Sequence, residues 1–173
     1  MRVLGVFGTI IWLGIIGCSQ NNLPEPTPFE TPLPLGFERP LYPEDNRPSA
    51  EKIALGKKLF FDNKLSKNEN ISCASCHKPE QAFSDNIPLS VGSHGKLGFR
   101  NSPSIVNVAY QSLFHKDGGV RTLELQVLAP LTDSLEMDAN LLTVLEYLQQ
   151  DEEYVTLFQQ AFNTSPNIFG ITR

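Results

Sequence analysis

Residues 73 to 77 read Cys73-Ala74-Ser75-Cys76-His77, and this stretch decides the fold. Its C-x-x-C-H spacing is the attachment motif of a c-type haem. Two residues between the cysteines place both thiols on one side of a helical turn, where each can form a thioether with a haem vinyl group. His77 can then coordinate the iron from one face. The sequence therefore predicts a covalent haem and redox chemistry.

Two other readings of paired cysteines fit the chain less well. A structural zinc ion needs four ligands, and the chain has three cysteines in all, with no second pair. A thiol redox site of the thioredoxin type needs alternating strands and helices, which the sequence does not indicate. Haem attachment of this kind occurs outside the cytoplasm in bacteria, so the interpretation requires an export signal.

The N-terminus has the pattern of such a signal. Arg2 precedes an apolar stretch over residues 3–17, which is shorter than a typical spanning helix and is followed at once by polar residues. The stretch ends in Ile15-Ile16-Gly17-Cys18, which resembles a bacterial lipobox, so we expect cleavage before Cys18 and lipidation of its thiol. A plain secretory signal is the alternative. Because Ser19 follows, we expect a lipid anchor on the periplasmic side of the envelope, at the outer membrane in a Gram-negative cell.

Composition divides the remaining chain in two. Prolines recur through residues 18–48, and such segments favour extended conformations, so we expect a tether that follows a signal peptide over residues 1–17. Residues 49–173 remain for a haem domain, whose last residues look like the start of a helix that is not completed. The net charge of −5 gives no basic field for nucleic acid, which is not expected as a partner.

Apolar periodicity predicts an all-α haem domain with long irregular loops. Ser49 can cap a first helix that reaches Phe60, and further helices are expected over residues 122–129, 138–150 and 152–162. No alternating strand pattern of useful length occurs. Residues 84–104 are punctuated by glycine and proline without helical period, and loops this long are usually functional or disordered. This loop carries His94.

The second face of the iron has three candidate ligands. His94 lies between Gly92 and Gly95, so a flexible loop could bring its imidazole over the haem; an exposed loop histidine is an equal alternative. His115 has polar neighbours typical of the surface. Met137 opens an apolar helix, where methionine is more often part of the core. A methionine ligand would indicate an electron carrier, whereas a displaceable histidine would indicate a reactive iron.

Two further polar residues fit peroxide chemistry. Cleavage of a bound peroxide requires one oxygen to lose a proton and the other to gain one. A carboxylate such as Glu136 can move that proton, and an amide such as Gln126 can orient the peroxide. Taken alone, Glu136 is more typical of an ordinary acid near a helix N-terminus.

An ordered series of segments resembles the bacterial di-haem cytochrome c peroxidase/MauG family. The matching segments are Leu55–Asp62, Leu65-Ser66, Ile71–His77, Phe83–Asp85, Gly92–Gly95, Arg100–Ser104, Asp117–Gly119, Leu123–Gln126, Ala129–Leu131 and Glu136-Met137. The resemblance covers residues 49–173 and is to the N-terminal haem domain, which holds the peroxidatic haem. It implies a cytochrome c-like fold and reduction of hydrogen peroxide to water, with electrons from a small cytochrome c or cupredoxin. Homodimers are common in the family.

The resemblance also implies roles for individual residues. They are haem attachment for Cys73 and Cys76, proximal ligation for His77, distal ligation for His94, peroxide cleavage for Gln126 and Glu136, and a calcium site near Asn101. In many members the distal histidine leaves the iron after the other haem is reduced, which would make His94 a gate.

Two departures from the family pattern affect this interpretation. The chain has a single C-x-x-C-H motif, so the second haem domain is missing; Arg173 then looks like an early end, and the isolated fragment is expected to turn over poorly. Lys116 stands where tryptophan is frequent, which puts an aromatic electron route between haems in question. A mono-haem electron carrier and a MauG-like oxidase remain open alternatives.

Overall fold

A computed structural model describes residues 26–30 and 32–173 of the chain. The expected signal peptide over residues 1–17 and the lipid site at Cys18 lie outside the described residues. Within the described part the regular elements are all helices, and no strand is formed. Isolated β-bridges join residues of the loops in this part of the chain. No helix there is both long and apolar enough to cross a membrane. The all-α prediction is confirmed.

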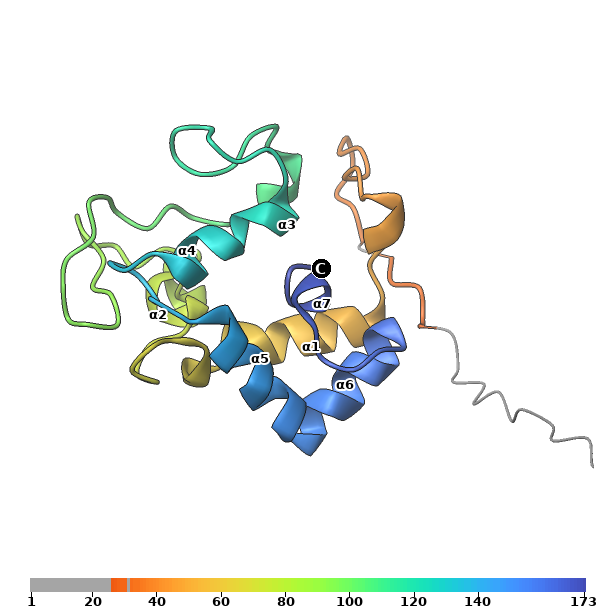
Figure 1. The fold of residues 1–173 in the computed structure, drawn as a ribbon. Coiled ribbons are helices and arrows are strands. Elements are labelled where there is room, and N and C mark those ends of the chain that lie inside the picture. The colour runs from red at the N-terminus through yellow and green to blue at the C-terminus, as the bar shows by residue number, and fades with distance from the viewer. Residues whose placement is uncertain (1–25, 31) are drawn as a thin grey trace, which may run out of the picture.

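The helices are short, and long connections separate several of them, whereas a single residue separates α3 from α4 and α5 from α6 (Figure 1). The α-helices are α1 (Ala50–Phe60), α2 (Cys73–Cys76), α3 (Leu123–Gln126), α4 (Leu128–Thr132), α5 (Leu141–Gln150), α6 (Glu152–Phe162) and α7 (Ile168–Ile171). Single 3-10 turns are η1 (Glu44–Asn46), η2 (Asn63–Leu65), η3 (Pro79–Gln81) and η4 (Val108–Tyr110).

Side-chain caps determine where the longer helices begin. The Ser49 hydroxyl accepts a hydrogen bond from the Lys52 amide at 3.2 Å and starts α1, as predicted. Asn140 caps α5 and Asp151 caps α6 in the same way. The helix predicted from residue 138 therefore begins later, at Leu141, because the Asn140 side chain satisfies the first free amides.

The helix predicted over residues 122–129 is two helices, α3 and α4, and it continues to Thr132. Pro130 was expected to stop it. Pro130 is instead the third residue of α4, where a helix residue has no intrahelical partner for its amide, so the missing N–H of proline costs little. The structure corrects this boundary and brings the end of α3 over the body of the domain.

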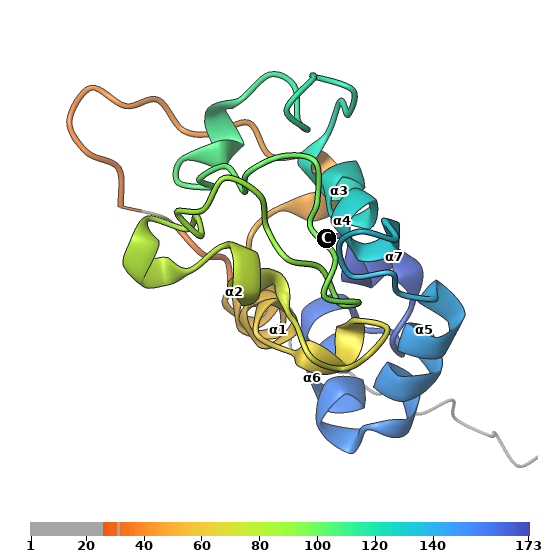
Figure 2. The ribbon, with the colours of Figure 1, turned by 90° about the vertical axis from the view of Figure 1, so that its left-hand side faces the viewer.

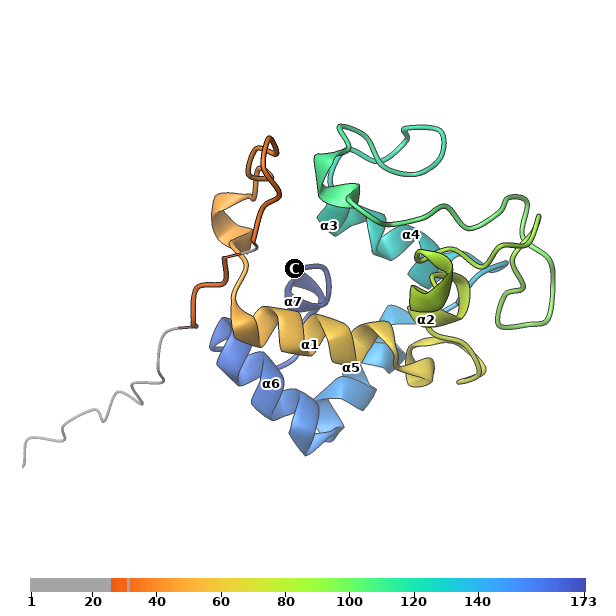
Figure 3. The ribbon, with the colours of Figure 1, turned by 180° about the vertical axis from the view of Figure 1, so that it is seen from behind.

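The core lies between α1, α5 and α6. Helices α1 and α6 run side by side, and α5 joins them at one end (Figure 3). The buried cluster contains Leu55, Leu59, Leu65, Leu131, Met137, Val144, Leu148, Tyr154, Phe158, Ala161 and Ile171. Met137, one candidate iron ligand, is a core residue with 4% of its surface exposed.

One carboxylate lies at the edge of this core. Asp62 Oδ2 accepts hydrogen bonds from the hydroxyls of Tyr154, at 2.6 Å, and Tyr147, at 2.9 Å. The Tyr154 residue is fully buried. The ammonium groups of Lys58 and Lys64 lie over the two tyrosine rings, 4.9 Å and 4.8 Å from the ring centroids. The cluster joins the end of α1 to α5 and α6.

The proline-rich segment contacts the helical domain at Thr27 and at Glu38. The Ala50 amide bonds to the Thr27 carbonyl at 3.0 Å, and the Thr27 amide bonds to the Glu51 carboxylate at 2.8 Å. Further along, the Tyr110 hydroxyl donates to the Glu38 carbonyl at 2.8 Å. This part of the expected tether therefore lies against the domain.

Candidate haem-binding site

The two motif cysteines occupy the single turn of α2. The Ser72 amide, just before the helix, donates to the Ser75 hydroxyl at 3.0 Å, which holds the start of the turn. Cys73 and Cys76 are free thiols and partly buried. Burial raises the pKa of Cys73 to about 11 and also raises that of Cys76. Both sulfurs are therefore protonated thiols at neutral pH, and neither is in a disulfide.

His77 is held in the orientation that a metal ligand needs. Its Nδ1 lies 3.0 Å from the Phe83 carbonyl oxygen and 3.2 Å from the Ser102 hydroxyl. A carbonyl can only accept, so Nδ1 carries the proton and the Nε2 lone pair is available for iron. Ala82 and Phe83 both have positive φ, 52° and 57°, and this turn directs the carbonyl at the imidazole. The irregular green segment of residues 84–104 lies beside α2 (Figure 2).

Glu136 lies within electrostatic reach of the motif. Partial burial of its carboxyl raises the pKa of Glu136, and the charge of Asp133 raises it further, although part of the residue reaches solvent. The charges of His115 and His77 act in the opposite direction. Glu136 in turn contributes to the raised pKa of Cys76. The charge of Glu136 therefore acts on the haem motif, and its role as a proton carrier stays a prediction.

Gln126 ends α3 with a buried acceptor. Its Oε1 has no hydrogen-bond partner among the described residues, although the atom is out of contact with solvent. Such an acceptor is costly unless a donor reaches it, and native proteins rarely leave one unpaired. Free thiols at Cys73 and Cys76, the available Nε2 of His77 and this unpaired amide oxygen together fit a covalent haem with a polar ligand. No hydrogen bond within the described chain joins Gln126 to Glu136.

His94 has partners for both ring nitrogens. Its Nε2 lies 2.7 Å from Asp138 Oδ2, and its Nδ1 lies 3.4 Å from the Asn68 side-chain nitrogen. An amide nitrogen can only donate, so Nδ1 accepts and Nε2 carries the proton that points at Asp138. In this arrangement the nitrogen expected to bind iron is held by a carboxylate. His94 is partly exposed, with 36% of its side-chain surface accessible.

The loop that carries His94 is fixed at its base. Ser93 is 2% exposed; its hydroxyl donates to the Asn70 side chain at 2.9 Å and accepts from the Asn68 amide at 3.1 Å. The Ser93 amide donates to the Glu136 carbonyl at 2.7 Å. A Cβ on Gly92 would lie 2.0 Å from the Leu135 carbonyl oxygen, so only glycine fits there. Sequence reasoning missed this network, whose signal was the pair of asparagines before α2.

The other candidate ligands lie apart from this network. His115 is exposed and adopts a positive φ of 60°, as expected for a turn at the surface. Asn101 is also exposed, and its side-chain oxygen accepts a hydrogen bond from the Lys116 ammonium. A calcium ion at Asn101 would have to displace that ammonium. Among the described residues no group of three or more His, Cys, Asp or Glu is arranged to hold a metal, and a calcium site near Asn101 stays a prediction.

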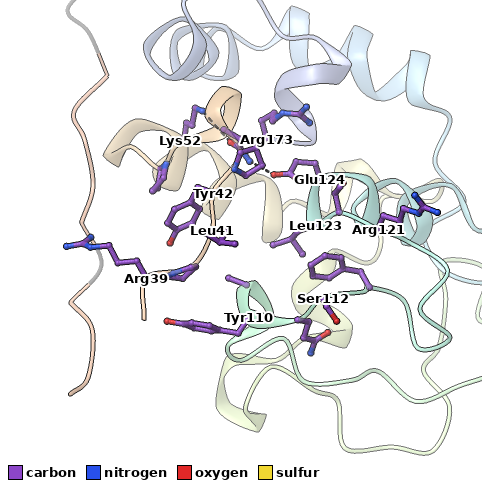
Figure 4. A pocket seen from close by; sticks show the side chains of 18 of the residues that line it. Arg39, Leu41, Tyr42, Lys52, Tyr110, Ser112, Arg121, Leu123, Glu124 and Arg173 are labelled. Carbon is purple, nitrogen blue, oxygen red and sulfur yellow. Dashed lines mark hydrogen bonds between the residues drawn. The ribbon is translucent and has the colours of Figure 1, made fainter. Parts of the chain in front are cut away.

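A groove that the sequence did not predict lies on another part of the domain. It has a volume of about 660 Å³ and is bounded by residues 38–48, the turn at Tyr110, the start of α3 and the chain end at Arg173 (Figure 4). Aromatic and apolar side chains line it together with the cations of Arg39, Lys52, Arg121 and Arg173. None of the predicted site residues lines this groove.

Comparison with known proteins agrees with the geometry of the site. Residues 50–173 match the family described as di-haem cytochrome c peroxidase. The chain is 37% identical over 143 residues to the methylamine utilization protein MauG of Methylophilus methylotrophus, covering 82% of this chain and 41% of MauG. It is 38% identical over 114 residues to the cytochrome c551 peroxidase of Pseudomonas aeruginosa, covering 66% of this chain and 33% of that enzyme.

Solved structures show the same relationship. A MauG-like protein associated with microbial copper homeostasis superposes with a TM-score of 0.76 at 34% identity, over 83% of this chain and 45% of that one. The diheme peroxidase BthA of Burkholderia thailandensis gives a TM-score of 0.62 at 28% identity, over 73% and 38%. The chain spans less than half the length of these relatives. It belongs to the di-haem cytochrome c peroxidase family, whose cofactor is a c-type haem.

Proposed function

We propose that this chain is the peroxidatic part of an enzyme that reduces hydrogen peroxide to water. The electrons would come from a small redox protein such as a cytochrome c or a cupredoxin. The observation that carries the proposal is the fixed imidazole of His77 next to two free thiols, with the charge of His77 acting on the Glu136 carboxyl. One haem would be held here, and a second would belong to a further domain of the longer relatives.

The haem would supply the iron at which peroxide binds and is reduced. Cys73 and Cys76 would hold its edge, and the Phe83 carbonyl would strengthen His77 as a ligand by accepting a hydrogen bond from its Nδ1–H. Glu136 would take a proton from one peroxide oxygen and return it to the other. Its raised pKa suits both steps, because a proton carrier works best when its pKa approaches the working pH.

Gln126 and His94 would act before and around that proton transfer. The buried Oε1 of Gln126 has no hydrogen-bond donor among the described residues, and it would accept a hydrogen bond from the bound peroxide. His94 would be a distal ligand in one state, and the contact with Asp138 would hold its Nε2 in the other. The two arrangements would make His94 a gate for access of peroxide to the iron.

The test is Glu136→Gln in the complete protein with its haems. We expect peroxide-dependent oxidation of reduced cytochrome c to fall by roughly 10²- to 10⁴-fold, the usual contribution of a positioned acid or base, while the haem spectrum stays nearly unchanged. Glu146→Gln, at an exposed acid on α5, is the matched control and should keep wild-type turnover. Unchanged turnover in Glu136→Gln would remove Glu136 from the mechanism.

A second candidate is a MauG-like oxidase, favoured by the 37% identity to MauG. The two candidates differ in what loses electrons. A peroxidase consumes peroxide only while a reduced redox protein is supplied, whereas an oxidase of this kind consumes it together with an organic or protein substrate. Stopped-flow measurement of peroxide loss, with and without reduced cytochrome c, separates them.

We also propose that Cys18 is lipidated and that the protein is anchored on the periplasmic side of the envelope. The support is the lipobox-like sequence before Cys18. Membrane fractionation of source cells, followed by intact-mass analysis, tests this: Cys18→Ser should move the protein from the membrane to the soluble fraction.

We also propose that the protein forms a homodimer, because homodimers are common in the family. Analytical ultracentrifugation of the complete protein tests this.

A further inference from the structure

Asp85 is a buried carboxylate that the proposed mechanism does not use. It is 4% exposed and lies in the turn after His77 and Phe83. Its Oδ2 accepts from the Ser90 hydroxyl at 2.5 Å, and its Oδ1 accepts from the Ile87 amide at 3.4 Å. No Lys, Arg or His forms a salt bridge with it in residues 26–30 and 32–173. A buried negative charge without a cation is expensive unless something nearby compensates for it.

The carboxylate is close to one of the two haem-attaching thiols. Burial is the first cause of the raised pKa of Cys76, and the charge of Asp85 is the next, so the two groups interact through the protein interior. The Ser90 hydroxyl that donates to Asp85 also interacts with the Cys76 thiol. The Lys78 amide, directly after His77, donates to the Ser84 carbonyl at 3.1 Å, so the residue before Asp85 is bonded to the chain that follows the haem motif.

The same turn reaches the proximal side of the site. Ser84, the residue before Asp85, donates to the Ser102 carbonyl at 2.8 Å, and the Ser102 hydroxyl lies 3.2 Å from His77 Nδ1. The backbone next to Asp85 is thus hydrogen-bonded to a residue that contacts the proximal ligand. These bonds fix the position of the Asp85 carboxylate relative to the haem motif.

We propose that the Asp85 carboxylate, buried in the turn that is hydrogen-bonded to the end of the haem motif, is the built-in counter-charge of the ferric haem and lowers the reduction potential of this haem. The inference rests on the proposed attachment of haem to Cys73 and Cys76. A ferric haem carries one more positive charge than the ferrous haem formed when its iron gains one electron. A nearby carboxylate therefore stabilises the ferric form more, since opposite charges attract strongly where water is excluded. Asp85 would thus help to keep this haem oxidised while peroxide is awaited.

The test is Asp85→Asn in the complete protein with its haems, with spectroelectrochemical titration of the haem in this domain. Asparagine removes the charge and keeps one oxygen acceptor for the Ile87 amide, while its NH2 group can donate to the Ser90 hydroxyl in place of the second acceptor. We expect the ferrous-to-ferric ratio at a fixed potential to rise about tenfold, as for a unit charge roughly 10 Å away at an effective dielectric constant of about 20. For a one-electron couple that is about 59 mV upward.

Three further variants sharpen the result. Asp85→Glu keeps the charge and should keep the wild-type potential. Glu80→Gln removes an exposed acid from the neighbouring turn η3 and should leave the potential unchanged. Ile87→Lys places a cation beside the carboxylate from a residue that is 43% exposed, and should raise the potential in the same direction without altering Asp85. Ile87→Lys also supplies the test if Asp85→Asn fails to fold.

Intact mass of each sample separates this inference from the proposed function. A wild-type protein without covalent haem would overturn the proposed function itself. An unchanged potential in Asp85→Asn, or in Ile87→Lys where Asp85→Asn does not mature, with haem attached, would overturn only the role of Asp85. An equal rise in Glu80→Gln would show a general effect of surface charge and would also overturn it.

Discussion

Removal of the Asp62 carboxylate should strongly destabilise the domain. Asp62→Ala leaves the buried Tyr154 hydroxyl without an acceptor, and hydrogen bonds to charged groups contribute about 1.5 to 3 kcal/mol each. The Tyr147 hydroxyl adds a second such bond, and the cap from Asp62 to the Lys64 amide adds about 0.5 to 1 kcal/mol. Because these three hydrogen bonds share one side chain, their contributions do not simply add, and we expect a total loss of about 4 kcal/mol in the free energy of unfolding.

The assay is urea unfolding followed by far-ultraviolet circular dichroism. Tyr154→Phe removes one hydroxyl and should cost about 2 kcal/mol. In the double variant Asp62→Ala/Tyr154→Phe, the two losses should overlap by about 1.5 kcal/mol or more, because each change breaks the same bond. Asn63→Ala, at the exposed neighbouring residue, is the control and should stay within about 0.5 kcal/mol of wild type.

The same cluster predicts a loss of stability in alkali. Burial, followed by the hydrogen bond to Asp62, raises the pKa of both Tyr154 and Tyr147 above their ordinary value. Groups with a raised pKa in the folded state stabilise it fully below the unfolded pKa, about 10 for tyrosine, and lose that contribution as the pH rises further. Stability should therefore fall above about pH 10, and less steeply in Tyr154→Phe. A loss below about 1 kcal/mol in Asp62→Ala at neutral pH would refute the reasoning.

Three other predictions concern the site and its supports. Gly92→Ala should displace the loop that carries His94, because its Cβ meets the Leu135 carbonyl at 2.0 Å; the check is altered hydrogen exchange of the Ser93 amide. Gly56→Ala, inside α1 with open space around its Cβ, should instead stabilise the domain by about 0.5 to 1 kcal/mol in urea unfolding. Glu136 has a raised pKa, so its ionised form opposes folding at neutral pH; Glu136→Gln should leave stability equal or higher there, and turnover of the wild type should fall as the pH drops through that pKa. A destabilised Glu136→Gln would contradict the burial of this carboxyl.

The sequence was sufficient for elements whose signals are local. α1 and α6 were predicted because their apolar periodicity and their capping residues lie side by side in the chain. The all-α class and the haem motif were predictable for the same reason. The helix boundary at Pro130 was not predictable. A proline that ends one helix and a proline in the first turn of the next cannot be distinguished in the sequence until the start of α4 is known.

Contacts between distant residues could not be predicted. Asp62 and Tyr154 are 92 residues apart, and His94 and Asp138 are 44 residues apart. Helical periodicity relates only residues a few positions apart, so it could not predict either pair. The resemblance to the family placed His94 as a distal ligand, but its partner in this structure depends on how the segment after Glu136 folds. The burial of Asp85 had no local signal either, since a Ser-Asp pair in a turn is typical of the surface.

The burial of the two motif thiols has a consequence for the order of assembly. A thiol with a pKa of about 11, as at Cys73, is almost wholly protonated at neutral pH, and only the thiolate attacks readily. The folded chain would therefore be slow to close a Cys73–Cys76 disulfide, but equally slow to react with a haem vinyl group. Thioether formation is then favoured on a chain in which α2 has not yet packed, so haem arrival sets the moment at which the domain closes. Faster labelling of Cys73 by a thiol reagent in urea than in buffer would record that order.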